Sequence, residues 1–171
     1  MKIKTMEDLL VHDLQDLLSA ENQLVEALPK MAAAANSAAL KKAFNDHLKQ
    51  TKTHVTRLDS ALKQMGKGPG REKCKGMAGL IEEGESAMED VTDPETLDAA
   101  LIGAAQRVEH YEIAGYGTAR AHAETLGMKD MADLLQTTLD EEGEANKLLT
   151  QLAEGRMTAG VNERATTTAQ R

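Results

Sequence analysis

Apolar residues recur along this chain at alternating steps of four and three positions, the spacing that gives an α-helix one buried face. The pattern predicts a first helix over residues 5–35 and a second over 37–65. It resumes over residues 92–126 and again over 129–154. Four long amphipathic segments without a strand pattern predict an all-α protein.

Two short turns and one long connection divide these helices into pairs. The turns near Asn36 and Gly127 are short, so each pair should form an antiparallel hairpin. Between Met65 and Glu95 the connection is about thirty residues long, and a weaker helical pattern lies within it at 72–89. This order predicts a ferritin-like four-helix bundle, in which two helical hairpins are joined by a long crossover containing a short extra helix.

Composition agrees with this architecture and sets its limits along the chain. Strong helix formers dominate the 171 residues, and the aromatic residues are only two Tyr and one Phe. The predicted bundle domain covers residues 1–154. Polar residues without periodicity follow, so we expect residues 155–171 to form a disordered tail.

The most informative positions are those where a charged or polar residue interrupts the apolar face. Glu21 holds such a place in the first helix, His54 in the second and Glu142 in the fourth. In the third helix Glu112 lies on the apolar face, with Glu109 one turn before it. The interruptions lie at similar distances from the hairpin turns, and both hairpins space a pair of them by 33 residues. They should therefore meet at one level of the bundle.

Several carboxylates buried together need a compensating cation, because they cannot all ionise without one. Carboxylate and imidazole ligands suit iron, manganese or zinc. In bundle di-metal sites two helices each supply a Glu and two supply a Glu-x-x-His motif. Here Thr51 replaces the Glu of the first motif and Ala145 the His of the second. Gln50 and Asn146 could contribute oxygens instead.

The sequence thus predicts two metal ions, iron before manganese or zinc, held by five residues: Glu21, His54, Glu109, Glu112 and Glu142. The alternative for each is a buried or solvated side chain satisfied by hydrogen bonds. We expect His47 to pack beside the site without binding metal, and Tyr116 to pack with a satisfied hydroxyl group. Cys74 should be a small buried side chain, and the acidic neighbours of Glu142 should be solvated.

Charge and composition also exclude several functions. The net charge is −8, whereas nucleic-acid binding needs a basic face. No apolar run is long enough to span a membrane, and the first residues lack the apolar centre of a signal peptide. The single Cys74 rules out an internal disulfide and favours a reducing, cytoplasmic location.

The sequence also resembles the YciE/YciF-type ferritin-like proteins of bacteria, roughly over residues 5–153. The segments that resemble this family are LLSAENQL (17–24), ALPKM (27–31), HLKQTKTHVTRL (47–58), GLIEEG (79–84), AAQRVEHYEIAGYG (104–117) and LDEE (139–142). The resemblance implies a rubrerythrin-like di-metal bundle, a homodimer and an association with stress responses. It implies that Glu21, Glu109, Glu112 and Glu142 are carboxylate ligands and that His54 belongs to the ligand region of the second helix.

These observations leave more than one function open. The first is a di-iron protein that oxidises iron or detoxifies peroxide, as a ferroxidase- or peroxidase-like oxidoreductase. The second is a structural or interaction protein that keeps a vestigial metal site, which the incomplete Glu-x-x-His motifs favour. A ferritin-type storage cage and a pocket for a small organic ligand are weaker alternatives.

Overall fold

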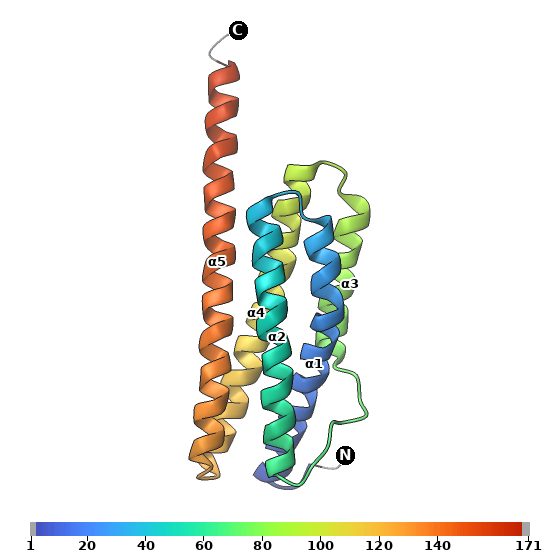
Figure 1. Cartoon of the computed structure of the whole chain (residues 1–171), viewed down its shortest axis with the longest axis vertical. Coiled ribbons are helices and arrows are strands. Elements are labelled where there is room, and N and C mark those ends of the chain that lie inside the picture. The colour runs from blue at the N-terminus through green and yellow to red at the C-terminus, as the bar shows by residue number, and fades with distance from the viewer. Residues whose placement is uncertain (1–2, 169–171) are drawn as a thin grey trace.

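The computed structural model describes residues 3–168, and it describes side chains as far as Gly155. All five regular elements in this part of the chain are α-helices, and they occur in the order α1 Met6–Ala34, α2 Ala38–Gln64, α3 Lys75–Asp90, α4 Pro94–Thr125 and α5 Lys129–Thr168. The helices α1 and α2 form one hairpin, α4 and α5 form the other, and α3 lies along α1 and α4 (Figure 1). The predicted all-α plan, including the short helix in the crossover, is confirmed.

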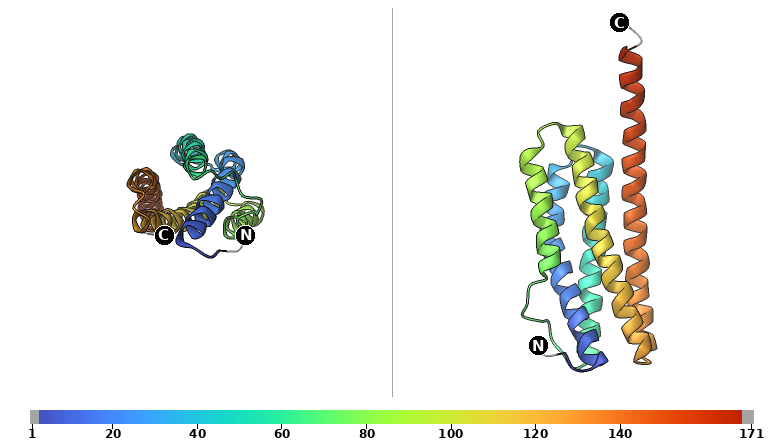
Figure 2. Two further views of the ribbon diagram at one scale, coloured as in Figure 1. Left: turned by 90° about the horizontal axis from the view of Figure 1, so that it is seen from below. Right: turned by 180° about the vertical axis from the view of Figure 1, so that it is seen from behind.

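The view along the bundle shows α3 outside the four long helices, packed against α1 and α4 (Figure 2). The fourth bundle helix, α5, was expected to end at Glu154, but its helical bounds extend to Thr168. Most of the expected tail, residues 155–171, lies outside the side chains that the structure describes. Its disorder therefore stays a prediction.

The starts of the helices follow from short-range hydrogen bonds. The Thr5 hydroxyl accepts from the Asp8 amide at 3.0 Å, and Asp8 accepts in return from the Thr5 amide at 3.2 Å. This reciprocal pair is the capping box that the sequence predicts for α1. The Asp93 carboxylate accepts from the Thr96 amide at 2.8 Å and caps α4, whose first residue is Pro94.

Two features fix how the hairpins meet. Asp98 of α4 is fully buried and accepts hydrogen bonds from the amides of Asn36 and Ser37, at 2.7 and 2.9 Å, in the α1–α2 turn. Near the middle of the bundle Gly115 lets α4 approach α1, since a Cβ atom at Gly115 would lie 2.8 Å from Cδ2 of Leu17. The two hairpins are thereby held in one register.

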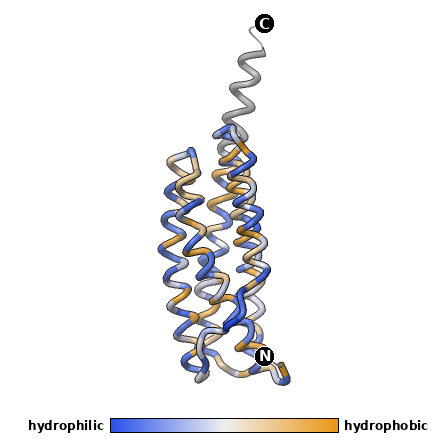
Figure 3. Tube along the Cα trace, turned by 90° about the vertical axis from the view of Figure 1, so that its right-hand side faces the viewer, coloured by the Kyte–Doolittle hydropathy of each residue, from blue (hydrophilic) through white to orange (hydrophobic). Residues whose placement is uncertain are grey.

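Apolar side chains fill both ends of the bundle and leave a polar layer between them. One apolar cluster includes Leu24, Phe44 and Leu101, and the other includes Leu14 and Leu58. Figure 3 shows how apolar and polar residues alternate along each helix, as amphipathic packing requires. Apart from Asp98 at the α1–α2 turn, the buried charged residues of the described core lie in the layer between the clusters, which apolar packing does not explain.

Candidate metal centre

Six buried side chains from four helices converge in the polar layer. They are the five residues predicted from the sequence and one more, His47: Glu21 from α1, His47 and His54 from α2, Glu109 and Glu112 from α4, and Glu142 from α5. They form two overlapping groups, one of His47, Glu109, Glu112 and Glu142, and one of Glu21, His54 and Glu142. Within each group one nitrogen or oxygen atom per residue lies within 4.8 Å of the others.

Helix geometry explains why these side chains meet. His47 and His54 are seven residues apart, which is close to two turns, so they point to the same side of α2. Glu109 and Glu112 are three residues apart and share a face of α4. The site therefore extends along the bundle axis, with the two histidines at its two ends.

Glu142 belongs to both groups and connects them. Its Oε1 lies 3.0 Å from Nδ1 of His54, and its Oε2 lies 3.8 Å from Nε2 of His47. Glu21 completes one end, with Oε1 3.3 Å from Nδ1 of His54. Glu109 completes the other, with Oε1 3.3 Å from Nε2 of His47. The carboxylate of Glu142 thus presents one oxygen to His54 and the other to His47.

Many of these atoms lack a hydrogen-bond partner among the residues that the structure describes. Both oxygens of Glu112 are buried without one, as are Oε2 of Glu142, Oε2 of Glu21, Oε2 of Glu109 and both ring nitrogens of His47. A buried polar atom without a partner typically costs about 1–3 kcal/mol. Lone pairs from four helices that face one another in this way fit a cation bound by oxygen and nitrogen.

Electrostatics support the same interpretation. Burial raises the pKa of Glu112 well above its usual value, and the neighbouring carboxylates Glu21, Glu142 and Glu109 raise it further. Burial and the charge of Glu142 likewise raise the pKa of Glu109. Each of these carboxyl groups is harder to ionise because the others lie beside it. A cation bound between them would favour their ionised forms.

The two histidines differ in charge. Burial lowers the pKa of His54, but its contacts with Glu142 and Glu21 outweigh burial and raise that pKa to about 10. At His47 burial dominates and lowers the pKa, which favours the neutral imidazole. A neutral imidazole with a free lone pair is the form that binds a metal ion.

Residues around the cluster hold it in place. Tyr116 is buried, and its hydroxyl donates a hydrogen bond to Glu21. On the far side of His54, Nε2 lies 2.8 Å from Oε2 of Glu141, whose carboxylate accepts two hydrogen bonds from Arg57 at 2.5 and 3.0 Å. We expected Glu141 to be solvated; it is instead half-buried and orients His54.

His47 is the residue that the sequence interpretation placed outside the ligand set. With it, the cluster has four Glu and two His, the same set that two single Glu and two Glu-x-x-His motifs supply. The second histidine comes from α2, two turns before His54, and not from position 145 of α5. The signal that could have identified it was its place on the same face as His54.

The other oxygens considered from the sequence are not among the buried atoms that converge. Gln50 is exposed and lies beside His47, and the side chain of Asn146 accepts a hydrogen bond from Gln106 at 3.4 Å. Cys74 is buried as expected, and its thiol caps α3 and contacts the Tyr111 hydroxyl at 2.9 Å and Asp16 at 3.2 Å. None of these residues belongs to the cluster.

Comparison with known proteins identifies the family. The profile of the family described as "Domain of unknown function (DUF892)" matches residues 5–166. The chain belongs to this family. It is 46% identical over 154 residues to Protein YciF of Escherichia coli strain K12, covering 90% of this chain and 93% of YciF.

Solved structures of relatives have the same fold. The crystal structure of the E. coli stress protein YciF matches with a TM-score of 0.88 and 44% identity, covering 91% of this chain and 99% of YciF. YcfI of Rhodopseudomonas palustris matches with a TM-score of 0.84 and 44% identity, covering 87% and 95% of the two chains. A ferritin-like, diiron-carboxylate protein of Bacillus anthracis strain Ames matches with a TM-score of 0.70 and 17% identity, covering 88% and 99%. The protein is therefore a ferritin-like homologue of YciF with a buried His/Glu cluster.

Proposed function

We propose that this protein binds two metal ions, iron in the first place, in the His/Glu cluster and uses them to oxidise ferrous iron or to reduce peroxide. The observation that supports this most is the set of buried oxygen and nitrogen atoms, from four helices, that lack hydrogen-bond partners among the described residues and face one another. Two iron ions bound there would supply one-electron or two-electron redox chemistry. Manganese or zinc suits the same ligand types.

The residues divide naturally between two positions. Glu21 and His54 would hold one ion, and His47 with Glu109 and Glu112 would hold the other. Glu142, which presents an oxygen toward each histidine, is the residue that would be shared. Glu141 keeps its hydrogen bond on Nε2 of His54 and so leaves Nδ1 directed toward the cluster. The missing motif residues at positions 51 and 145 are then no obstacle to a full ligand set.

The surroundings suit a site that must be kept from bulk water. Apolar clusters lie above and below it, and its side chains are buried. Burial strengthens every charge interaction in the site. A stress-related role agrees with the description of its relative YciF as a stress protein. We also propose that the protein is a cytoplasmic homodimer. None of the described helices combines the length and apolarity needed to cross a membrane.

A second candidate function is a structural or interaction protein with no catalytic metal. The ion pairs of His54 with Glu21 and Glu142 favour it, because a protonated His54 could balance part of the negative charge without a metal ion. The two candidates differ in whether the cluster contains metal in purified protein, and this can be measured directly.

The test is elemental analysis of protein purified from iron-replete cells, as wild type, Glu112→Gln and Glu142→Gln, with Glu144→Gln as the control. Glu144 lies on α5 near Glu142, but its side chain is 72% exposed. Two redox-active ions per chain in the wild type and the control, with loss in both cluster variants, would support the proposal. Wild-type protein that stays free of metal after anaerobic loading with ferrous iron would refute it.

A further inference from the structure

An apolar cavity of about 30 Å³ adjoins the candidate metal centre. Its walls come from α1, α2, α4 and α5, and its polar end is formed by His47 and Glu109. Leu148 also lines the cavity and is 44% exposed, one of only three large apolar side chains that are exposed in the described part of the chain. The cavity therefore lies between one end of the cluster and the exposed side chain of Leu148.

Small side chains make room for this cavity. Ala43, Ala105 and Ala145 contribute to its walls from three different helices. Ala145 lies three residues after Glu142, at the position where a Glu-x-x-His motif would have its histidine. An imidazole there would occupy the space that alanine leaves open, while His47 supplies the second histidine from α2. The departure from the motif thus moves a ligand and opens a pocket beside it.

The size and lining of the cavity select the molecule that fits. A volume of about 30 Å³ is room for about two water-sized groups, since one water needs roughly 10–15 Å³. A hydrated ferrous ion would have to lose its water shell against apolar walls that offer no replacement ligands. Hydrogen peroxide would leave its hydroxyl groups unpaired along the same walls. An apolar diatomic molecule has no hydrogen bonds to water to lose when it enters such a cavity.

We propose that this cavity is the binding and entry pocket for dioxygen, which reaches the cluster at His47 and Glu109. The proposal rests on the proposed function, because it names the oxidant for the same site. It assigns a different route to ferrous iron and peroxide, and it makes Ala145 a residue that determines access. The apolar character of the pocket can be tested without any metal in the protein.

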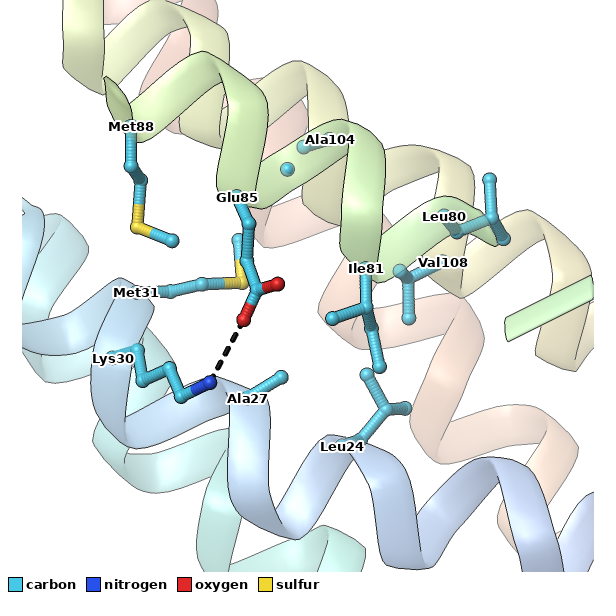
Figure 4. Close-up of a pocket in the computed structure, with 11 residues that line it drawn as sticks. Leu24, Ala27, Lys30, Met31, Leu80, Ile81, Glu85, Met88, Ala104 and Val108 are labelled. Carbon is cyan, nitrogen blue, oxygen red and sulfur yellow. Dashed lines mark hydrogen bonds and ion pairs between the residues drawn. The ribbon is translucent and has the colours of Figure 1, made fainter. Parts of the chain in front are cut away.

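A second apolar cavity provides the matched control. It has about 20 Å³ and lies between α1, α3 and α4, where Lys30 and Glu85 form an ion pair at 2.8 Å across it (Figure 4). It shares some wall residues with the first cavity, but it contains no residue of the cluster. Ala27 lines only this second cavity. Ala27→Leu therefore adds the same bulk to the core as Ala145→Leu without filling the proposed pocket.

The first experiment uses xenon as an apolar probe on crystals of the full chain prepared with a chelator. We expect xenon beside His47 and Ala145 in the wild type and in Ala27→Leu, and its loss from that position in Ala145→Leu. Ala43→Leu, which fills the pocket from α2, serves as a second variant in case Ala145→Leu does not fold. No xenon beside His47 in the wild type, or xenon that persists in both filled variants, would overturn the proposal.

The second experiment measures how fast iron-loaded protein is oxidised by dioxygen and, separately, by hydrogen peroxide. Ala145→Leu should slow oxidation by dioxygen about tenfold or more, leave oxidation by peroxide unchanged, and bind iron as the wild type does. Equal slowing with both oxidants would overturn the assignment of dioxygen to this pocket. If xenon binds but the protein takes up no iron, the pocket stands as an apolar gas-binding site and it is the proposed function that fails.

Discussion

Nδ1 of His54 lies 3.0 Å from Oε1 of Glu142 and 3.3 Å from Oε1 of Glu21, so one imidazole edge faces two buried carboxylates. These contacts raise the pKa of His54 to about 10 against the opposing effect of burial. Without a bound cation the imidazole is therefore protonated at neutral pH and balances part of the charge of the cluster. A metal ion that binds at Nδ1 must displace this proton, so binding and proton release are linked.

Replacing Glu112 should have different effects on the stability of the metal-free protein and on metal binding. Both of its oxygens are buried without hydrogen-bond partners in the described structure, and they lie among carboxylates. Glu112→Met should therefore stabilise chelator-treated protein at neutral pH by about 1–3 kcal/mol, the typical cost of an unsatisfied buried polar group. The same change should remove the gain in melting temperature that added metal gives the wild type.

Thermal unfolding with and without a chelator measures both effects, with Glu144→Met as the exposed control on α5. The control should change neither value. A Glu112→Met protein that is less stable than the wild type in the presence of chelator would contradict the idea that this carboxylate is present for a ligand.

The pH dependence of stability should have opposite signs with and without metal. The pKa values of Glu21, Glu109 and Glu112 are raised by burial, so each destabilises the chelator-treated protein increasingly as pH rises above their ordinary value of 4.5. The raised pKa of His54 acts in the same direction, because its stabilisation is complete below 6.5 and is lost as pH rises through about 10. Chelator-treated protein should thus unfold at a higher temperature at pH 5.5 than at pH 8.

Metal should reverse this trend, because its ligands bind it in their deprotonated forms. The increase in melting temperature on adding manganese, which does not air-oxidise as readily as iron, should therefore grow from pH 5.5 to pH 8. Melting curves at both pH values, at one ionic strength, provide the measurement. A metal effect that is independent of pH would mean that the ion binds outside this cluster.

The sequence predicted the helical plan well because each helix has a strong periodic pattern and short-range end signals. Thr5 with Asp8, and Asp93 with Pro94, are local features that act within one turn. The convergence of Glu21, His54, Glu109, Glu112 and Glu142 could also be predicted, because depth along a helix follows from counting residues from a turn.

The rest of the site depends on contacts that no local pattern contains. His47 reaches the cluster because the site extends along the bundle axis by two helical turns. Counting residues from the hairpin turns predicts side chains at only one level of the bundle. Glu141 could not be distinguished from a solvated residue, because its role depends on Arg57 and His54 of α2. The cavity beside Ala145 results from small residues on three helices, a coincidence visible only after packing.

The close approach of α1 and α4 provides a test of the register on which the site depends. A Cβ atom at Gly115 would lie 2.8 Å from Cδ2 of Leu17. Gly115→Ala should therefore destabilise the protein by about 1–3 kcal/mol through overpacking, although alanine is the better helix former. Gly143→Ala on α5, where a Cβ would meet nothing within 4 Å, is the control and should be neutral or stabilising. Denaturant unfolding of both variants, with equal stability as the refuting result, checks the packing.

Glu141 tests whether a residue that touches no predicted metal position can tune the site. Its carboxylate accepts from Arg57 and lies 2.8 Å from Nε2 of His54, which leaves Nδ1 directed toward Glu21 and Glu142. Glu141→Gln removes the charge that fixes this orientation, and such changes weaken metal affinity typically by about 10- to 100-fold. The neighbouring Asp140 is exposed and accepts a hydrogen bond from Gln136 at 2.7 Å, so Asp140→Asn should leave metal affinity unchanged.

The measurement is a competition titration of metal against a chelator of known affinity, run on wild type and both variants. Weakening should be larger for the ion at His54 than for the ion at His47, because Glu141 contacts only the first of these histidines in the described structure. Two sites weakened equally, or neither weakened, would show that Glu141 serves the packing of α2 against α5 and not the orientation of a ligand. An affinity change confined to one of two sites would also demonstrate that the cluster binds two distinct ions, each with its own histidine.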